Sequence, residues 1–282
     1  MRTVVDDLGT EVRVPEHPER LVSLVPNLSE TLWWWRLADR LVAVTDHCVA
    51  PPWAFDHAVR VRGTKNPDVA AIIDLIPDLV VSNEEENREL DVRRLREAGI
   101  AVYVTRVRTV RDAAEALGAL GAALGVGAAG TGLQHALLRA LDQRRPPARP
   151  LRTACPIWRD GDHRGADETW WLVGGDTFAG DLLTRCGFAP ALPEIADGRY
   201  PRLALGTLAD ADPDAVLLPD EPYAFAATDA EVFADWRARV RYLDGTALTW
   251  WGPRTPHALG DLSRSARQLA RPLRTRQPTH SP

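Results

Sequence analysis

Two polar segments carry side chains that could bind a charged ligand. Residues 46–48 (Asp-His-Cys) follow the apolar run 41–44, and residues 83–87 (Asn-Glu-Glu-Glu-Asn) follow the run 79–81. Ligands of open α/β sheets bind outside the carboxyl ends of the strands, so both segments are expected at a binding site. We interpret Asn83 and Glu84 as pocket residues. The two glutamates after them are interpreted as the solvated first turn of a helix.

His47 and Cys48 are the candidate metal ligands, because imidazole and thiolate bind borderline metals. Neighbours in sequence rarely both face one ion, and a free cysteine is usually a buried small hydrophobe. A loop histidine beside a buried thiol is therefore the favoured interpretation. A closed zinc site wants about four ligands, and Glu84 is the one further obvious candidate, so a bare metal is not the expected ligand.

Lys65 is the only lysine of the chain, since every other basic residue is arginine. It lies in the segment 63–67, ahead of a short predicted helix, where its ammonium could meet an anionic ligand. An ammonium differs from a guanidinium in shape and hydration, which favours a function for this residue. Chance retention in an arginine-rich sequence explains the same observation equally well.

Ten tryptophans are many for 282 residues. Several lie in predicted loops near strand ends, where aromatic side chains commonly line ligand clefts. The three at 33–35 are predicted on a helix, where they could equally pack in the core or form a wall of the cleft. The ligand-binding candidates of the C-terminal half are Trp158, Arg159, Trp171, Tyr223, Trp250 and Trp251.

No catalytic motif is recognisable. Residues 125–130 satisfy G-x-G-x-x-G, but a helix is predicted ahead of them where the dinucleotide fingerprint demands a strand. H-E-x-x-H, G-x-S-x-G and P-loop patterns are absent from the sequence. We therefore expect a binding protein and no enzyme. Two alternatives stay open: an enzyme acting on a metal chelate through His47, Cys48 and Glu84, and an interaction module with a vestigial cleft.

Composition limits the partners and the location. The chain has 34 basic and 39 acidic residues, a net charge of −5, and no basic domain, so nucleic acid is not expected as a partner. No apolar run approaches the ~20 residues of a membrane helix, and the first residues do not resemble a secretory signal. Three scattered cysteines do not suggest a disulfide framework. These features predict a cytoplasmic protein without membrane insertion.

Alternating apolar runs and helical patterns predict an α/β fold with two lobes. Strands are expected at 20–25, 41–44, 78–81 and 101–104, and the pattern restarts at 153–158 and 215–218. Two helical stretches at 110–124 and 128–144 lie between the two series. A later strand is expected to end at the pair 250–251, before a closing helix at 256–270. The expected parts are a hairpin (1–19), an N-terminal α/β lobe (20–126), a linking helix (127–146), a C-terminal α/β lobe (147–272) and a tail (273–282).

Four segments carry a resemblance to a known family: 20–30 (Arg-Leu-Val-Ser-Leu-Val-Pro-Asn-Leu-Ser-Glu), 77–80 (Pro-Asp-Leu-Val), 99–100 (Gly-Ile) and 212–216 (Asp-Pro-Asp-Ala-Val). In their order they resemble the helical-backbone metal receptor family, which includes vitamin B12 and ferric-siderophore receptors. The resemblance implies two Rossmann-like lobes joined by one long helix. It also implies a chelated metal as the ligand, bound in the cleft between the lobes.

Departures from the B12-receptor pattern imply a different ligand. His47 falls where a corrin-contacting tyrosine is expected and Asn83 where a tryptophan is expected, whereas the pair 250–251 matches the aromatic pair of the second lobe. Lys65 and Glu84 have no counterpart in the pattern. The resemblance therefore implies a smaller or more charged chelate than intact cobalamin, which could be cobalamin-, siderophore- or haem-like.

Two further positions bear on transport. Family members that feed an ABC importer present one glutamate from each lobe to arginines of the permease. Ala70 and Gly206 occupy those positions here, so docking to a conventional importer is not expected. The pocket itself is expected to bring His47, Lys65, Asn83 and Glu84 together, facing Trp158, Arg159, Tyr223 and Trp250.

Overall fold

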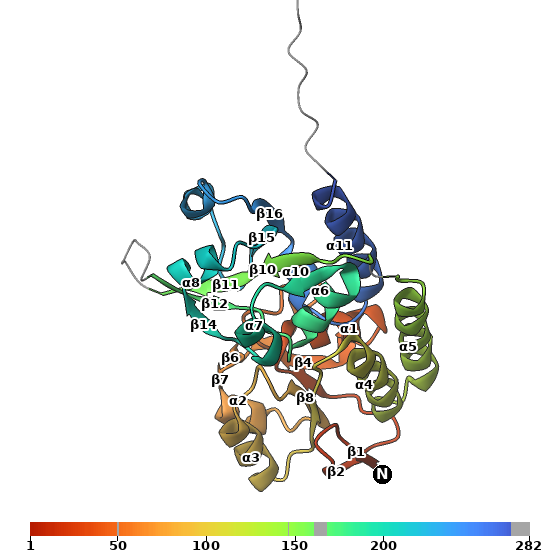
Figure 1. Ribbon diagram of the computed structural model, residues 1–282. Helices are drawn as coiled ribbons and strands as arrows, with labels where there is room; N and C mark the ends of the chain where they lie inside the picture. Colours follow the sequence, from red (N-terminus) through yellow and green to blue (C-terminus); the bar gives the residue numbers. More distant parts are fainter. Residues whose placement is uncertain (50, 146, 161–167, 272–282) are drawn as a thin grey trace, which may run out of the picture. The chain divides into compact units, whose positions relative to one another are not determined.

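The chain forms two compact units (Figure 1). The computed structural model describes residues 1–49, 51–145, 147–160 and 168–271. Unit 1 comprises Met1–Gln143 and Thr246–Pro256, and unit 2 comprises Arg144–Gly245 and His257–Pro282. Each unit contains a parallel sheet with helices, so the predicted α/β class is confirmed. In the described part of the chain, no helix is both long enough and apolar enough to span a bilayer.

Unit 1 is built on a five-stranded parallel sheet in the order β5-β4-β3-β8-β9. Strands β3 and β8 are buried at every residue. Their sequences accordingly lack the alternation of apolar and polar residues that is typical of a strand with one solvent-exposed face. The strands are β3 (Leu21–Ser23), β4 (Leu41–Val44), β5 (Val59–Arg60), β8 (Leu79–Asn83) and β9 (Val102–Thr105). The helices that connect them are α1 (Pro26–Trp34), η1 (Ala38–Arg40), α2 (Val69–Asp74) and α3 (Glu89–Glu97).

Two antiparallel hairpins complete the strands of unit 1. They pair β1 (Arg2–Val5) with β2 (Glu11–Val14), and β6 (Arg62–Gly63) with β7 (Asn66–Pro67). The first hairpin was predicted from alternation around Gly9, which adopts φ 80° in the turn. The second hairpin was not predicted, because its strands are two residues long.

Helices α4 (Val110–Ala123) and α5 (Gly127–Asp142) pack against each other through glycine (Figure 1). A Cβ at Gly121 would meet the Gly130 Cα at 2.6 Å, so neither position has room for a side chain. Thr109 and Asp112 form a capping box that starts α4. Gly125, at φ 76°, turns the chain between the helices. The G-x-G-x-x-G match therefore follows a helix, as expected, and runs into the first turn of α5.

Unit 2 contains two sheets. The parallel sheet has the order β13-β10-β15-β16, and the antiparallel sheet has the order β11-β12-β14. The strands are β10 (Leu151–Ala154), β11 (Pro156–Arg159), β12 (Thr169–Leu172), β13 (Phe188–Pro190), β14 (Arg202–Ala204), β15 (Ala215–Pro219) and β16 (Arg239–Leu243). The helices are α6 (Phe178–Cys186), α7 (Pro193–Asp197), α8 (Leu205–Asp210), α9 (Ala227–Ala230), η2 (Glu231–Phe233) and α11 (Thr255–Leu269). The apolar run 153–158 is thus shared between two sheets and is not one strand.

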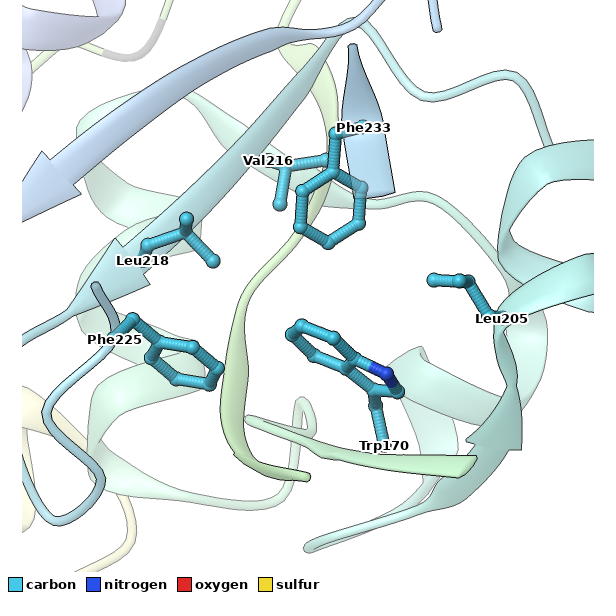
Figure 2. Packing of buried hydrophobic residues seen from close by; sticks show 6 residues of the cluster. All are labelled: Trp170, Leu205, Val216, Leu218, Phe225 and Phe233. Atoms are coloured by element: carbon cyan, nitrogen blue, oxygen red, sulfur yellow. The ribbon is translucent and has the colours of Figure 1, made fainter. Parts of the chain in front are cut away.

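A core around Trp170 holds the two sheets of unit 2 together (Figure 2). The Trp170 ring stacks on Phe225 with centroids 5.5 Å apart and meets Phe233 edge-on at 5.4 Å. Leu205, Val216 and Leu218 close the cluster. Trp170 comes from β12 and Val216 from β15, so one indole bridges the antiparallel and the parallel sheet.

The segment 246–256, which we call the strap, groups with unit 1. The sequence prediction assigned it to the C-terminal lobe and ended a strand at 250–251, whereas the structure has helix α10 (Gly245–Thr249) there and no strand over 250–251. Asn27 Nδ2 donates to the Trp251 carbonyl at 2.9 Å. Arg254 Nε lies 2.8 Å from both carboxylate oxygens of Glu30. These contacts join the strap to α1.

Candidate functional site

The loops after β3, β4, β8 and β9 leave the same edge of the unit 1 sheet, because its strands are parallel. This edge carries three of the predicted site residues, His47, Lys65 and Glu84, and all three are exposed. Arg108 joins them from the loop after β9, with its Nη2 3.6 Å from Glu84 Oε2. We call His47, Lys65, Glu84 and Arg108 the polar edge. Arg108 was not predicted, because nothing in its local sequence marks it as a partner of Glu84.

Asn83 lies at this edge but turns inward. It is 4% exposed, and its Nδ2 donates to the backbone carbonyl and the hydroxyl of Thr105. Its Oδ1 accepts from the backbone amides of Glu85 and Glu86. The side chain therefore shapes the loop that presents Glu84, and in this structure it offers no free group to a ligand.

Asn87 is a second buried amide that organises the edge. Its Oδ1 accepts from the Asn83 amide at 2.9 Å, and its Nδ2 donates to the carbonyls of Leu24 and Thr64. Asn87 therefore joins the ends of β3 and β8 to the β6–β7 hairpin. Asn87 was not predicted as a site residue, because the carbonyls that accept its hydrogen bonds are far away along the chain.

Lys65 lies at the tip of the β6–β7 hairpin and donates through Nζ to the Glu85 carbonyl. A Cβ placed on Gly63 would lie 3.5 Å from His47 Nε2, so the imidazole passes over the same hairpin. The structure thus brings the 46–48 loop, the hairpin and the 83–87 loop close to one another within unit 1.

His47 and Cys48 do not share a metal site in this structure. The imidazole is exposed, whereas Cys48 is 1% exposed. Its Sγ accepts a hydrogen bond from the Ser29 hydroxyl at 2.9 Å and shares one with the Thr45 hydroxyl at 3.1 Å. Burial raises the pKa of the Cys48 thiol, which favours the protonated form at neutral pH. Within the described ranges, no group of three or more His, Cys, Asp and Glu side chains could hold a metal ion.

In unit 2, the antiparallel sheet places Trp158, Trp171 and Arg202 in one row. Trp158 pairs with Trp171, and Trp171 pairs with Arg202, in the registers of β11-β12 and β12-β14. Directly opposed residues of antiparallel strands project from the same face. All three are exposed: Trp158 by 47%, Trp171 by 36% and the Arg202 side chain by 52%. We call these three residues the indole–arginine row.

Arg159 projects from the other face of the sheet, as its cross-strand partner Trp170 does. Its side chain is 15% exposed and forms ion pairs with Glu168 at 2.7 Å and Asp229 at 2.5 Å. The guanidinium also lies 5.5 Å from the centroid of the Trp170 ring. Arg159 therefore stabilises the core through its ion pairs. The arginine on the exposed face of the sheet is Arg202, which was not predicted from the sequence.

The remaining aromatic candidates divide between the units. Tyr223 meets Trp158 edge-on at 5.5 Å and also packs against Phe225 of the Trp170 core, with ring centroids 4.6 Å apart. Trp250 and Trp251 lie in the strap and belong to unit 1, contrary to the prediction. Trp251 is buried, and Trp250 is half-buried with the Arg254 guanidinium 5.3 Å from its ring.

A small cavity of unit 2 is too tight for a chelate. It has a volume of about 20 Å³ and lies between α6 and β10, with Cys155, Gly174 and Leu183 among its walls. About 10–15 Å³ of such space holds one water molecule. The exposed surfaces described above are therefore the better candidates for ligand binding.

Comparison with known proteins places this geometry in a family. The profile described as Periplasmic binding protein matches residues 21–235. A vitamin B12-binding protein of Vibrio cholerae is 30% identical over 106 residues, which are 38% of this chain and 38% of that protein. A cobalamin-binding protein of Halobacterium salinarum is 28% identical over 221 residues, 76% of this chain and 58% of that protein. The matched region thus spans less than two thirds of either relative's length.

A solved structure supports the fold. The periplasmic heme-binding protein RhuT from Roseiflexus sp. RS-1, in its apo form, matches with a TM-score of 0.75 at 21% identity, over 90% of this chain and 99% of that one. At this identity the likeness establishes a shared fold, and it agrees with the two-lobed α/β architecture expected from the sequence. The chain therefore belongs to the periplasmic binding protein family, whose members among these relatives are substrate-binding proteins and not enzymes.

Proposed function

We propose that this protein is a receptor for a small metal chelate of cobalamin-, siderophore- or haem-like type. The observation that carries the proposal is the indole–arginine row, in which two adjacent exposed indoles are followed by a guanidinium on one face of a sheet. Exposed aromatic rings beside a few fixed polar groups suit a ligand with both a ring surface and charge. The names of the two B12- and cobalamin-binding relatives support this ligand class.

The polar edge of unit 1 is proposed as a separate candidate surface for a charged ligand. It offers an imidazole, an ammonium and a carboxylate–guanidinium pair from loops that Asn83 and Asn87 hold by buried hydrogen bonds. Side chains on loops fixed in this way need little ordering when a ligand binds. Such groups would orient a charged ligand at this edge.

Native mass spectrometry of the purified protein tests the proposal, followed by titration with cyanocobalamin, ferrichrome and hemin. We expect at least one chelate to bind, and Trp171→Ala to weaken that binding. Trp34→Ala is the matched control. Trp34 is also an exposed tryptophan, but it lies at the end of α1 in unit 1 and is not part of the indole–arginine row. Absence of binding by all three chelates, with no ligand carried through purification, would contradict the proposal.

We also propose that the protein does not serve a conventional importer. Ala70 on α2 is exposed and Gly206 on α8 is half-exposed, and neither helix has an acidic residue in its first turn. A complex with an ABC permease formed through these two surfaces would contradict this proposal. The cytoplasmic location stays a separate prediction, and recovery of the protein from the periplasm or a lipid-anchored fraction would overturn it.

A further inference from the structure

Arg202 is held at one end of its guanidinium and open at the other. Its Nε lies 2.6 Å from Asp160 Oδ2 and 3.1 Å from the Thr169 hydroxyl. No hydrogen bond or ion pair joins its Nη1 or Nη2 to another of the described residues. The two terminal nitrogens form the fork that binds a carboxylate with two parallel hydrogen bonds. The side chain therefore presents a fixed, unused carboxylate-binding fork.

The neighbours of Arg202 keep that fork in place. Asp160 also accepts from the Trp171 indole Nε1 at 3.3 Å, so one carboxylate ties the arginine to the adjacent ring of the row. Asp160 follows β11, and its backbone amide donates to the Thr169 carbonyl of β12 at 3.0 Å. The guanidinium is thus anchored to the sheet rather than free in solvent, which reduces the conformational entropy lost when it binds a ligand.

We infer that Arg202 binds a carboxylate of the ligand, and that the ligand is a planar metal chelate with free carboxylates on its rim. The inference rests on the proposed function and narrows its ligand class. Neighbouring positions in an antiparallel sheet are about 5 Å apart, so the guanidinium and the Trp171 ring can contact one ligand together. A ring system then lies against the two indoles while its carboxylate reaches Arg202.

Porphyrin and corrin chelates differ in the groups on their rims, and Arg202 could distinguish between them. A porphyrin rim carries ionised carboxylates, whereas the corrin ring of cobalamin carries neutral amides. A guanidinium donates to either group, but only a carboxylate adds a full opposite charge and can accept both terminal N–H groups in the fork geometry. A receptor that uses Arg202 in this way should therefore prefer the carboxylate-bearing chelate.

The test is a spectroscopic titration of the full-length protein with hemin and with cyanocobalamin. We expect the wild-type protein to bind hemin more tightly than cyanocobalamin. Arg202→Gln should weaken hemin binding by about 10- to 100-fold, as expected for loss of hydrogen bonds to a charged group. Arg202→Lys should recover only part of the loss, because an ammonium lacks the planar fork.

Arg237→Gln is the control, because Arg237 is a strongly exposed arginine of unit 2 that lies 3.9 Å from Asp212. It should leave hemin affinity unchanged, and circular dichroism should confirm that each variant is folded. If cyanocobalamin binds and hemin does not, or if Arg202→Gln binds hemin as the wild type does, the inference fails and the proposed function stands. If no chelate binds the wild-type protein, the proposed function fails, and the inference fails with it.

Discussion

All three cysteine side chains are buried, and burial shifts their titration. Loss of solvent raises the pKa of Cys155 to about 12 and that of Cys186 to about 11, and it raises the pKa of Cys48 as well. An unfolded thiol ionises near pH ~8.5. Between that pH and the folded-state value, the unfolded chain has released protons that the folded chain retains. The contribution of these buried thiols to the free energy of unfolding is therefore fully present below pH ~8.5 and is lost as the pH rises above it.

Cys155→Ala isolates this effect. From pH 8 to pH 10 the wild-type protein should lose about 2 kcal/mol of unfolding free energy through Cys155 alone, and the variant should not lose that part. The chain suits the measurement because, besides its three cysteines, it has one lysine and four tyrosines to titrate near this range. Urea unfolding at the two pH values measures the difference.

Leu183→Ala is the control, because Leu183 lines the same cavity as Cys155 but does not titrate. It should lower stability at both pH values and keep the wild-type pH dependence. An equal loss between pH 8 and pH 10 in Cys155→Ala and the wild type would contradict the prediction.

At the scale of the element, the α4–α5 pair depends on two glycines that touch. A Cβ on Gly130 would lie 2.9 Å from both the Gly121 Cα and the Leu117 carbonyl oxygen. Both atoms belong to the backbone of α4, so they cannot move aside as a side-chain tip could. The distance between the helices is therefore fixed by the absence of two side chains.

Gly130→Ala should destabilise the protein by roughly 1–3 kcal/mol, because the methyl group pushes the helices apart. Gly132→Ala makes the same chemical change two residues further along α5, where nothing lies within 4 Å of the new Cβ. It should stabilise the protein by up to about 1 kcal/mol, since alanine is the better helix former. Chemical denaturation measures both variants, and a change of the same sign in both would contradict the packing argument.

At the scale of the whole molecule, the chain passes between the two units three times, after Gln143, after Gly245 and after Pro256. The last two passages enclose the strap. The strap is held to α1 by Arg254 on Glu30, whose carboxylate is nearly buried, and by Asn27 on the Trp251 carbonyl. Gly252 of the strap lies so close to α1 that a Cβ there would meet the Thr31 hydroxyl at 2.8 Å.

A protease site inserted after Arg145 should therefore cut the chain without separating the two fragments, because the strap belongs to the second and binds the first. Arg254→Met should weaken this association by about 2 kcal/mol, since it leaves the Glu30 carboxylate unpaired. Arg264→Met removes an arginine from an exposed pair with Asp261 and should have little effect. Size-exclusion chromatography after cleavage is the measurement. Equal behaviour of the two variants would contradict a role for the Arg254–Glu30 pair.

The sequence alone determined the parts whose cause is local. Continuous apolar runs predicted β4 and β8, and the helix ahead of Gly125 excluded a dinucleotide site. The position of Glu84 after β8 predicted that it lies at the carboxyl edge of the sheet, where the structure has it exposed, whereas the two glutamates after it, predicted to be solvated, are half-buried. Each of these follows from a residue and its near neighbours, through periodicity or through the direction in which a strand ends.

The tertiary structure decided the parts that depend on distant pairing. Trp158, Trp171 and Arg202 form one row only because β11, β12 and β14 pair in one register, and a shift of one residue would expose Arg159 instead. Asn83 turned inward because Thr105 of the neighbouring strand bonds its amide. Trp250 joined unit 1 because the strap binds α1, more than 200 residues earlier in the chain. Strand pairing and docking of this kind are set by contacts between remote residues, which a local pattern does not encode.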